Sequence, residues 1–411
     1  MAKILIESEE IGPTVYEFTK IIKALGKSHP SQYRLVKGSR VREHDIRWCD
    51  IIISVRSLSS LDWRIARLAK KKGKFHILNL DDDFLGIARN YGLSGSGIWP
   101  QRQKALRRIL DYTDIVLTDN HLLGEKYTNI GKVSRYCLIN TIVSPESIVT
   151  SSLESKINKK TKIVYYVNDG TTLFFEQFIR PILPKLCERY SSKISLTLMA
   201  LKPEISEYEG KLDIICVDHM HFKEFREYLS QQNFDIGLAP LDGKGFSKYK
   251  YFNKFIEHSI AGIAGIYSNC EPYTFIIKNM MNGILTENSS EEWFEALEQL
   301  IEDDQLRHRI VNNAQKELID NFSSEKIIQG LIKDIPELIN YSAPKMNFSI
   351  EMIWIQWTYI IFRIGEYLYF AVWHLKDEGI FKFITRAVRY MKRIISEHLK
   401  VKKISKDWKY E

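Results

Sequence analysis

Three consecutive carboxylates, Asp81, Asp82 and Asp83, follow an apolar run at positions 75–80. Acid clusters of this kind can hold a divalent ion on a nucleotide diphosphate, and a single carboxylate can bind or deprotonate a hydroxyl. The same residues are also common as a plain helix cap at the end of a strand. These three residues alone leave the alternatives open.

A second group of residues suited to chemistry lies at positions 234–269, where an apolar run ends at a proline, a glycine-rich loop follows, and a helical pattern begins near Lys250. Loop glycines allow the backbone to approach a ligand, ammonium groups suit a diphosphate, and a carboxylate suits the two hydroxyls of a ribose. The residues concerned are Gly243, Lys244, Gly245, Lys248, Lys250, Lys254 and Glu257. Together they predict a nucleotide-sugar site. The alternative is a solvated lysine-rich loop in which Glu257 pairs with Lys254 one turn away.

The elements that must position these residues alternate between apolar runs and helical patterns over the first 340 residues. Such alternation is typical of a parallel, doubly wound α/β sheet. A polar, Ser- and Lys-rich segment at 144–162 interrupts the pattern, which then starts again. We therefore predict two Rossmann-like domains, 1–150 and 160–340, facing each other across a cleft. Because ligands bind at the carboxyl ends of parallel strands, the acids at 81–83 should lie in that cleft. The predicted strands are 3–7, 50–55, 75–80, 114–118, 162–167, 194–200, 212–217, 234–240 and 264–268.

The stretch 257–268 resembles the donor-domain signature of retaining GT-B glycosyltransferases of the family-4 type. Glu257, Gly262, Ile266 and Ser268 match that signature, and residues 282–327 are similar to the closing segment of the family. The resemblance extends over about 161–340, and the first domain matches only in its strand and helix pattern. It implies a GT-B fold, a nucleotide-sugar donor as substrate, retention of anomeric configuration and no cofactor.

By this resemblance, Glu257 would bind the donor ribose, Lys254 would lie near the diphosphate, and the loop at Gly170 would face the donor. The sequence departs from the family in three places. Tyr249 stands where the family often has another glutamate that contacts the transferred sugar, and Ala264 stands where it has a proline. The usual basic pair after the first strand of the second domain is missing. The loop lysines would then supply the missing charge.

The resemblance also bears on the three acids. GT-B transferases hold the diphosphate with backbone amides, a helix N-terminus and basic side chains, so no metal is required. Asp81, Asp82 and Asp83 fall in the other domain, on the acceptor side, together with Gly12 after the first strand. We expect no metal site there and expect Asp82 to bind or deprotonate the acceptor hydroxyl. With Glu257 and Lys254 it completes the predicted catalytic set.

Length and composition are those of a folded, multidomain chain. The 411 residues exceed one ordinary core, and apolar and aromatic fractions of 45% and 12% exclude a disordered protein. The N-terminal sequence does not have the pattern of a secretory signal. Five cysteines are scattered without metal-ligand spacing, which indicates reduced thiols in the cytoplasm.

The net charge of +8 is concentrated in the tail, where ten Lys and Arg residues oppose three acids from Ile380 onward. The remaining body is nearly neutral. This balance argues against a nucleic-acid-binding body, and any electrostatic partner should meet the tail; nucleic acid is a third choice for the tail, which has no recognisable nucleic-acid-binding module.

The tail, 345–411, lies outside the usual two-domain body. Its apolar run at 352–362 has 11 residues, short of the roughly 20 that a membrane-spanning helix needs, and its aromatic residues, including Trp354 and Trp357, suit the lipid headgroup region. Residues 379–399 have one apolar face and a dense basic face, which is typical of a helix on an anionic membrane surface. The alternative is that this face packs on the first domain or on a second subunit. The basic residues are Lys382, Arg386, Arg389, Lys392 and Arg393.

These observations predict a cytoplasmic glycosyltransferase, peripheral on the inner face of the plasma membrane. It would move a sugar from a nucleotide-sugar donor to a lipid-linked or glycan acceptor in cell-surface polysaccharide assembly. Two alternatives stay open. One is a non-catalytic GT-B subunit that binds a partner enzyme through the tail, as Tyr249 and the missing basic pair suggest. The other is a nucleotide-sugar 2-epimerase, which shares the fold. The sequence leaves the oligomeric state open.

Overall fold

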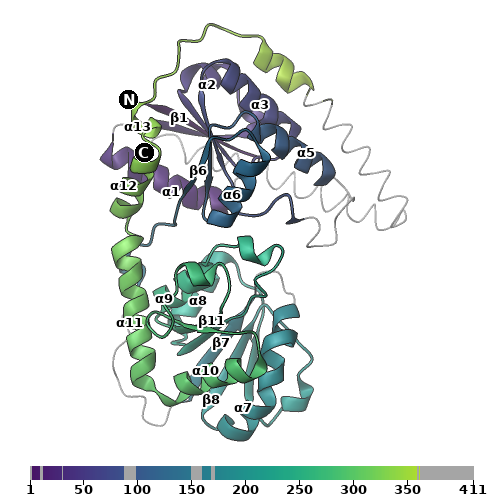
Figure 1. Ribbon diagram of the computed structural model, residues 1–411, viewed down its shortest axis with the longest axis vertical. Coiled ribbons are helices and arrows are strands. Elements are labelled where there is room, and N and C mark those ends of the chain that lie inside the picture. The colour runs from purple at the N-terminus through teal and green to yellow at the C-terminus, as the bar shows by residue number, and fades with distance from the viewer. Residues whose placement is uncertain are drawn as a thin grey trace, which may run out of the picture.

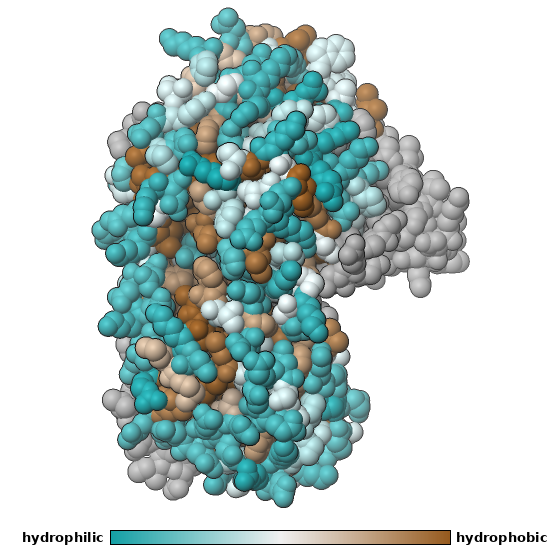
Figure 2. All heavy atoms as spheres, viewed as in Figure 1, coloured by the Kyte–Doolittle hydropathy of each residue, from teal (hydrophilic) through white to brown (hydrophobic). Residues whose placement is uncertain are grey.

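The computed structural model describes residues 2–9, 13–29, 31–87, 99–149, 160–167, 172–358 and 361. It consists of two α/β domains, each built on a six-stranded parallel sheet with helices on both faces (Figure 1). Hydrophilic side chains cover most of the face of both domains that is seen in Figure 2. The predicted fold class, two Rossmann-like domains, is confirmed.

The first domain has the strand order β2-β1-β3-β4-β5-β6. Central strands such as β3 are fully buried, as expected for a parallel sheet covered on both faces. The order reverses between β1 and β3, and this reversal makes the carboxyl edge there the expected ligand position. The elements are β1 (Lys3–Ser8), α1 (Pro13–Ser28), β2 (Gln32–Lys37), α2 (Glu43–Trp48), β3 (Ile51–Val55), α3 (Ser60–Lys71), β4 (Phe75–Asn79), α5 (Trp99–Leu110), β5 (Ile115–Thr118), α6 (His121–Ile130) and β6 (Arg135–Leu138).

The second domain has the order β12-β11-β10-β7-β8-β9, the strand order of a dinucleotide-binding Rossmann fold with its switch point between β7 and β10. The carboxyl end of β7 is therefore where a ligand is expected. The elements are β7 (Thr161–Tyr166), α7 (Leu183–Tyr190), β8 (Ile194–Met199), β9 (Asp213–Val217), α8 (Phe222–Gln231), β10 (Ile236–Ala239), α9 (Asn253–Ala261), β11 (Ala264–Ser268), β12 (Ile284–Thr286), α10 (Ser290–Glu302) and α11 (Asp304–Asn321).

The chain returns to the first domain after α11. Helix α12 (Ser324–Asp334) lies against α1, and α13 (Glu337–Asn340) follows it. Ile327, Ile328 and Leu331 of α12 belong to the same apolar cluster as residues of β1 and α1. The predicted second domain, 160–340, therefore ends in two helices that pack on the first domain (Figure 1).

The segment after α13 continues along the first domain and is helical at 351–358. Met352 is 1% exposed and packs in a cluster with residues of α2 and α3, whereas Trp354 and Trp357 are 65% and 64% exposed. One face of the predicted aromatic segment thus packs on the domain and the other faces solvent. In the described part of the chain, no helix combines the length and the hydropathy needed to cross a membrane.

Candidate active site

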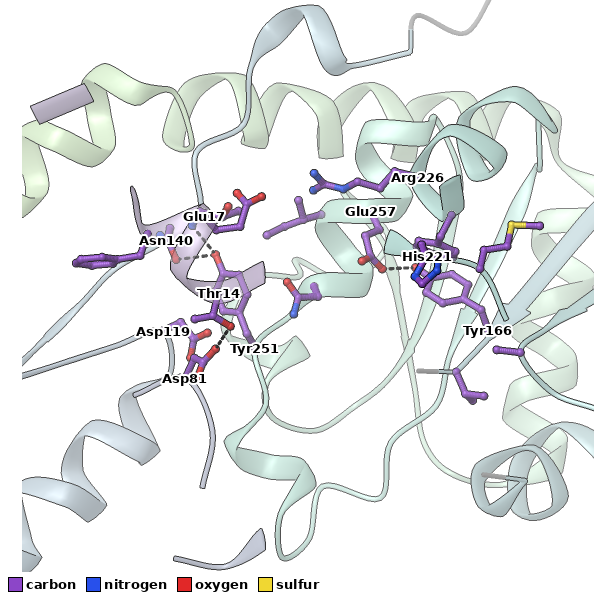
Figure 3. Close-up of a pocket in the computed structure, with 18 of the residues that line it drawn as sticks. Thr14, Glu17, Asp81, Asp119, Asn140, Tyr166, His221, Arg226, Tyr251 and Glu257 are labelled. Carbon is purple, nitrogen blue, oxygen red and sulfur yellow. Dashed lines mark hydrogen bonds between the residues drawn. The ribbon is translucent and has the colours of Figure 1, made fainter. Parts of the chain in front are cut away.

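A cavity of about 460 Å³ lies between the two domains (Figure 3). The first domain contributes α1 and the residues that follow β4, β5 and β6, and the second contributes the carboxyl ends of β7, β8 and β9 together with α8 and α9. Both sheets therefore direct their carboxyl edges at one volume, as expected for ligand sites in parallel sheets. The polar lining residues include Thr14, Glu17, Asp81, Asp119, Asn140, Tyr166, Asp218, His219, His221, Arg226, Tyr251 and Glu257.

On the second-domain side, Glu257 of α9 faces the carboxyl end of β7. Tyr166 Oη donates to Glu257 Oε2 at 2.8 Å, and Lys254 Nζ donates to the carbonyl oxygen of Tyr166, also at 2.8 Å. Burial raises the pKa of Glu257, while the Tyr166 hydrogen bond and the positive charges of Arg226 and Lys254 oppose that rise. The predicted pair, Glu257 and Lys254, thus meets on Tyr166, and Glu257 lines the cavity whereas Lys254 does not.

The position of α9 is fixed by its close packing on β10 and by a C-terminal residue in the left-handed conformation. Gly262 ends the helix with φ of +72°, a conformation that favours glycine. On its inner face, a Cβ at Gly237 of β10 would lie 2.5 Å from the His258 imidazole, so only a glycine strand position lets α9 approach this closely. The predicted helix end at Gly262 is confirmed, while the helix begins at Asn253, three residues after the predicted start near Lys250.

The glycine-rich part of the loop before α9, at 242–249, does not line the cavity, although Tyr251 near the end of the loop does. Gly243 and Gly245 have φ of +63° and +51°, and a Cβ at Gly243 would lie 2.6 Å from Cys270 Cβ, so this glycine serves packing against the neighbouring loop. Of the predicted donor residues, Gly243, Lys244, Gly245 and Lys250 lie outside the described cavity wall.

This loop is held by the first domain. The Asn120 side-chain amide donates to the carbonyl oxygens of Lys248 and Lys250, at 3.0 and 2.9 Å. Tyr249 packs against an apolar cluster of the first domain, with Lys126 Nζ 4.5 Å from the centre of its ring. The position that holds a glutamate in the resembled family is here an interdomain contact.

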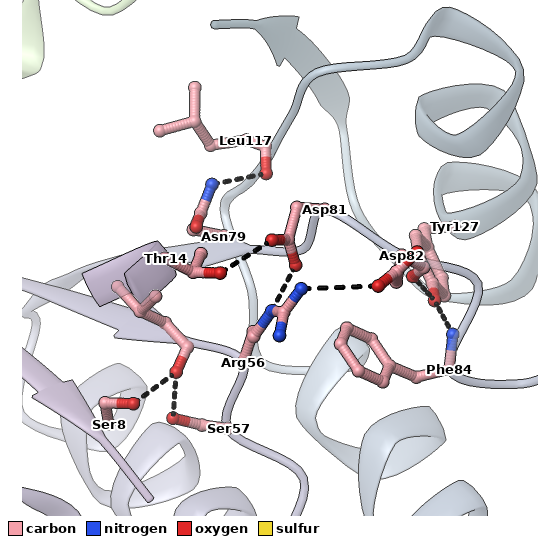
Figure 4. Close-up of polar contacts among 11 residues, drawn as sticks. Ser8, Thr14, Arg56, Ser57, Asn79, Asp81, Asp82, Phe84, Leu117 and Tyr127 are labelled. Atoms are coloured by element: carbon pink, nitrogen blue, oxygen red, sulfur yellow. Dashed lines mark hydrogen bonds and ion pairs between the residues drawn. The ribbon is translucent and has the colours of Figure 1, made fainter. Parts of the chain in front are cut away.

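On the first-domain side, Arg56 lies between two of the three predicted acids (Figure 4). Its Nε donates to Asp81 at 2.5 Å and its Nη2 donates to Asp82 at 3.2 Å. Asp81 also accepts a hydrogen bond from Thr14 Oγ1 at 3.0 Å and lines the cavity. Asp82 is not among the lining residues. Burial, and next the charge of Asp81, raise the pKa of Asp82 to about 6.

The third acid is structural. Asp83 is 3% exposed, accepts a hydrogen bond from Lys126 Nζ at 2.6 Å, and accepts another from the Gly86 backbone N–H at 3.0 Å. The sequence DDD therefore divides into one acid in the cavity, one on Arg56 and one inside the domain. No group of three or more His, Cys, Asp or Glu side chains in the described part of the chain is arranged to hold a metal ion.

Asp119, which follows β5, is a site residue that the sequence reasoning missed. It lines the cavity, and its Oδ1 is buried without a hydrogen-bond partner among the described residues. Burial and the charges of Asp81 and Asp82 raise its pKa well above the usual value, which favours its neutral form. Its signal in the sequence is the same as that of Asp81: an acid directly after a buried strand.

Arg226 of α8 was also missed. It is the only Lys or Arg among the described residues that line the cavity, and Figure 3 shows it near Glu257. The guanidinium group in the cavity thus comes from α8, a helix whose sequence contains no indication of a ligand-binding residue. His219 and His221, which follow β9, line the same wall.

Several predicted site residues lie outside the described part of the chain. Among the donor and acceptor residues these are Gly12 and Gly170, and in the tail they are Arg386, Arg389, Lys392 and Arg393. Their roles remain predictions.

No known family model and no curated protein sequence matches this chain. Solved structures do match in fold. HepE of Anabaena, solved in complex with UDP, aligns with a TM-score of 0.55 at 12% identity over 82% of this chain and 100% of that chain. Sucrose-phosphate synthase from Thermosynechococcus elongatus aligns with a TM-score of 0.56 at 12% identity, over 82% of this chain and 99% of that one.

The chain has the GT-B fold. The predicted architecture is confirmed, and the cavity between the domains is the cleft expected for it. Membership of family 4 in particular stays a prediction.

Proposed function

We propose that this GT-B protein is a glycosyltransferase that moves a sugar from a nucleotide-sugar donor to an acceptor hydroxyl. The observation that supports this most is the pairing of walls in one cavity: Glu257 and Tyr166 on one side, Asp81 and Asp119 on the other. A bisubstrate transfer needs a site for each reactant within reach of the other.

On the donor side, the Glu257 carboxylate accepts hydrogen bonds from the two ribose hydroxyls, and Tyr166 holds it in position. Arg226 faces the diphosphate, because a guanidinium suits phosphate oxygens. UDP is the first nucleotide to test, since the HepE structure contains it. Lys254, whose amine binds the Tyr166 carbonyl, acts by positioning this wall.

On the acceptor side, we assign the contact with the hydroxyl to Asp81 rather than to Asp82, because Asp81 lines the cavity. Asp119, as a carboxylic acid, donates to a second acceptor oxygen. Asp82 positions Asp81 through Arg56.

In the reaction, the acceptor oxygen bonds to the anomeric carbon as the bond from that carbon to the diphosphate breaks. The hydroxyl proton passes to the departing phosphate oxygen. The protein stabilises the charge that develops on the diphosphate through Arg226 and orients the hydroxyl through Asp81, with no metal in either role. Retention of configuration follows the resembled family.

The acceptor in this proposal is lipid-linked, and the setting is assembly of a surface polysaccharide on the inner face of the plasma membrane. The exposed Trp354 and Trp357 support a membrane location, as does the basic pattern of the sequence at 379–399. The basic helix predicted there would lie on anionic lipid.

The test begins with binding. At a UDP concentration of 100 times Kd, the unfolding free energy should rise by about 2.7 kcal/mol, and other nucleoside diphosphates serve as controls. UDP-sugars are then incubated with a membrane extract, and transfer of label to lipid is measured. Absence of nucleotide binding by the folded chain would contradict the proposal.

The non-catalytic alternative keeps one observation in its favour, because Tyr249 packs on the first domain where the family has a sugar-contacting glutamate. Nucleotide binding without any transfer or hydrolysis of a UDP-sugar panel would favour that function.

A further inference from the structure

Helices α3 and α5 together form a cationic surface on the first domain. They pack against each other, and Figure 1 shows them on the same side of the domain as the helix 351–358. Asp62, the acidic residue of α3, is 1% exposed, and α5 contains no acidic residue. We name the outward Lys and Arg residues of these helices the cationic face: Arg64, Arg67, Lys70, Lys71, Lys104, Arg107 and Arg108.

Three acidic residues border the seven cations. Asp114 pairs with Lys70, Glu351 pairs with Lys71 at 2.8 Å, and Asp111 is exposed just after α5.

Three of the seven cations, Arg67, Lys104 and Arg107, form no ion pair in the described part of the chain, so this face keeps an excess of positive charge. The guanidinium groups of Arg64 and Arg108 both lie over the Trp63 ring, 5.5 and 5.0 Å from its centre. Burial and then the Arg108 charge lower the pKa of Arg64. The body is nearly neutral as a whole but has a basic side on the first domain, which is a second candidate surface for an electrostatic partner beside the tail.

Exposed apolar side chains lie next to this face. The helix 351–358 is joined to α3 by a hydrogen bond from Arg64 to Thr358 and by the Lys71 ion pair. Its Met352 side is buried, which fixes the opposite side outward. The outward residues of this segment are Phe348, Ile350, Ile353, Trp354, Trp357 and Ile361, which are 40–67% exposed.

We propose that the cationic face and this apolar segment dock the first domain on an anionic lipid bilayer. Lys and Arg are attracted to acidic headgroups, and tryptophan is enriched at the boundary between headgroups and acyl chains. Exposed isoleucines gain from burial in acyl chains but would gain nothing from a nucleic acid backbone. This docking surface deepens the proposed use of a lipid-linked acceptor, on which it rests for its purpose, and it is separate from residues 362–411.

The experiment uses the full chain and vesicles of phosphatidylcholine with and without 30% phosphatidylglycerol. The test variant is Arg67→Gln/Lys104→Gln/Arg107→Gln, in which no described ion pair is lost. The matched control removes three exposed cations of the second domain that also form no described ion pair, Lys211→Gln/Arg309→Gln/Lys316→Gln.

Affinity for the anionic vesicles should fall in the test variant by about fivefold per cation, or of the order of a hundredfold. The difference should shrink in high salt. The control should bind as the wild type does. Trp354→Ala/Trp357→Ala should weaken binding at low and high salt alike.

Equal affinity of the test variant and the wild type, or an equal loss in the control, would overturn the docking surface. Loss of binding to poly(U) RNA with vesicle binding intact would also overturn it and assign the face to nucleic acid. UDP binding and unfolding temperature are measured on the same samples. Normal UDP binding with unaffected vesicle binding defeats this inference alone, whereas absent UDP binding in the wild type defeats the proposed function.

Discussion

The hydrogen bond from Tyr166 to Glu257 is the contact on which the proposed donor site depends, and Tyr166→Phe removes it without removing the ring. Tyr166 is 2% exposed, and its hydroxyl lies 2.8 Å from the carboxylate. Burial raises the pKa of Glu257, and this hydrogen bond is the largest effect that opposes the rise. The variant should therefore have a Glu257 pKa that is higher still.

The magnitude follows from the class of the bond. A hydrogen bond to a charged group contributes about 1.5–3 kcal/mol, and each 1.4 kcal/mol is a factor of ten in affinity. Because only the ionised carboxylate accepts from both ribose hydroxyls, UDP affinity should fall by at least about tenfold at neutral pH. Binding is lost as pH falls through the pKa of Glu257, so in Tyr166→Phe that loss should begin at a higher pH.

The assay is calorimetric titration with UDP from pH 5 to 8. Glu257→Gln should bind weakly at every pH and lose this pH dependence. Tyr190→Phe is the matched control, since that buried hydroxyl donates to Glu298 and Glu302 on the far side of the domain. An unchanged affinity and pH profile in Tyr166→Phe would refute the assignment of Glu257 as the ribose ligand.

Four further outcomes are expected. Asp81→Asn should lower the rate of sugar transfer at least tenfold and leave UDP affinity unchanged. Asp83→Asn should instead lower the free energy of unfolding by about 3 kcal/mol, because it leaves the Lys126 charge unpaired. If Asp83→Asn lost transfer and Asp81→Asn lost stability, the two acids would be misassigned. Sugar transfer should persist in EDTA, and its loss with recovery in Mg²⁺ or Mn²⁺ would restore a metal site. Burial, and then the charge of Asp62, raise the pKa of Glu7 to about 8. Between pH 4.5 and 8 the Glu7 carboxyl therefore ionises in the unfolded chain but not in the folded one, so folding stability should fall as pH rises through this range. Glu7→Gln should reduce that fall in urea unfolding by a few kcal/mol, at about 1.4 kcal/mol per unit, and an equal fall in both proteins would contradict it. A chain ending at residue 361 should keep its unfolding temperature, but one ending at 344 should lose at least about 2 kcal/mol, because Met352 is 1% exposed; equal stabilities would show that Met352 does not anchor the segment.

Much of the fold could be predicted from sequence because buried parallel strands are continuous apolar runs. β3 and β8, fully buried along their length, were predicted to within one or two residues at each end. The edge strand β2 was missed because its sequence QYRLVK mixes polar and apolar residues and none of its side chains is fully buried. The return of α12 to the first domain was also missed, since an apolar stripe does not specify which core it covers.

The site was predictable only in part, because the sequence does not always specify in which direction a side chain points. Glu257 was found because a helix fixes where its residues point, and the signature placed it on α9. Lys244 and Lys250 do not line the cavity. The loop turns at Gly243 and Gly245 with positive φ at both, and no residue pattern specifies the course of such a loop. Arg226 gave no signal, since an arginine on an amphipathic helix is ordinary until the packing of α8 beside α9 and Glu257 is known.

Asn120 links the two domains through its side chain. Its side-chain oxygen accepts from the Leu123 N–H and so caps α6, while its amide group holds the loop of the opposite domain. The domains cannot part without breaking both amide contacts and exposing Tyr249, a cost of about 1–3 kcal/mol for the hydrogen bonds. Each escape of spent nucleotide through a widened cleft would have to overcome that cost. In the proposed glycosyltransferase, opening of this contact would then limit product release, and kcat would depend on solvent viscosity.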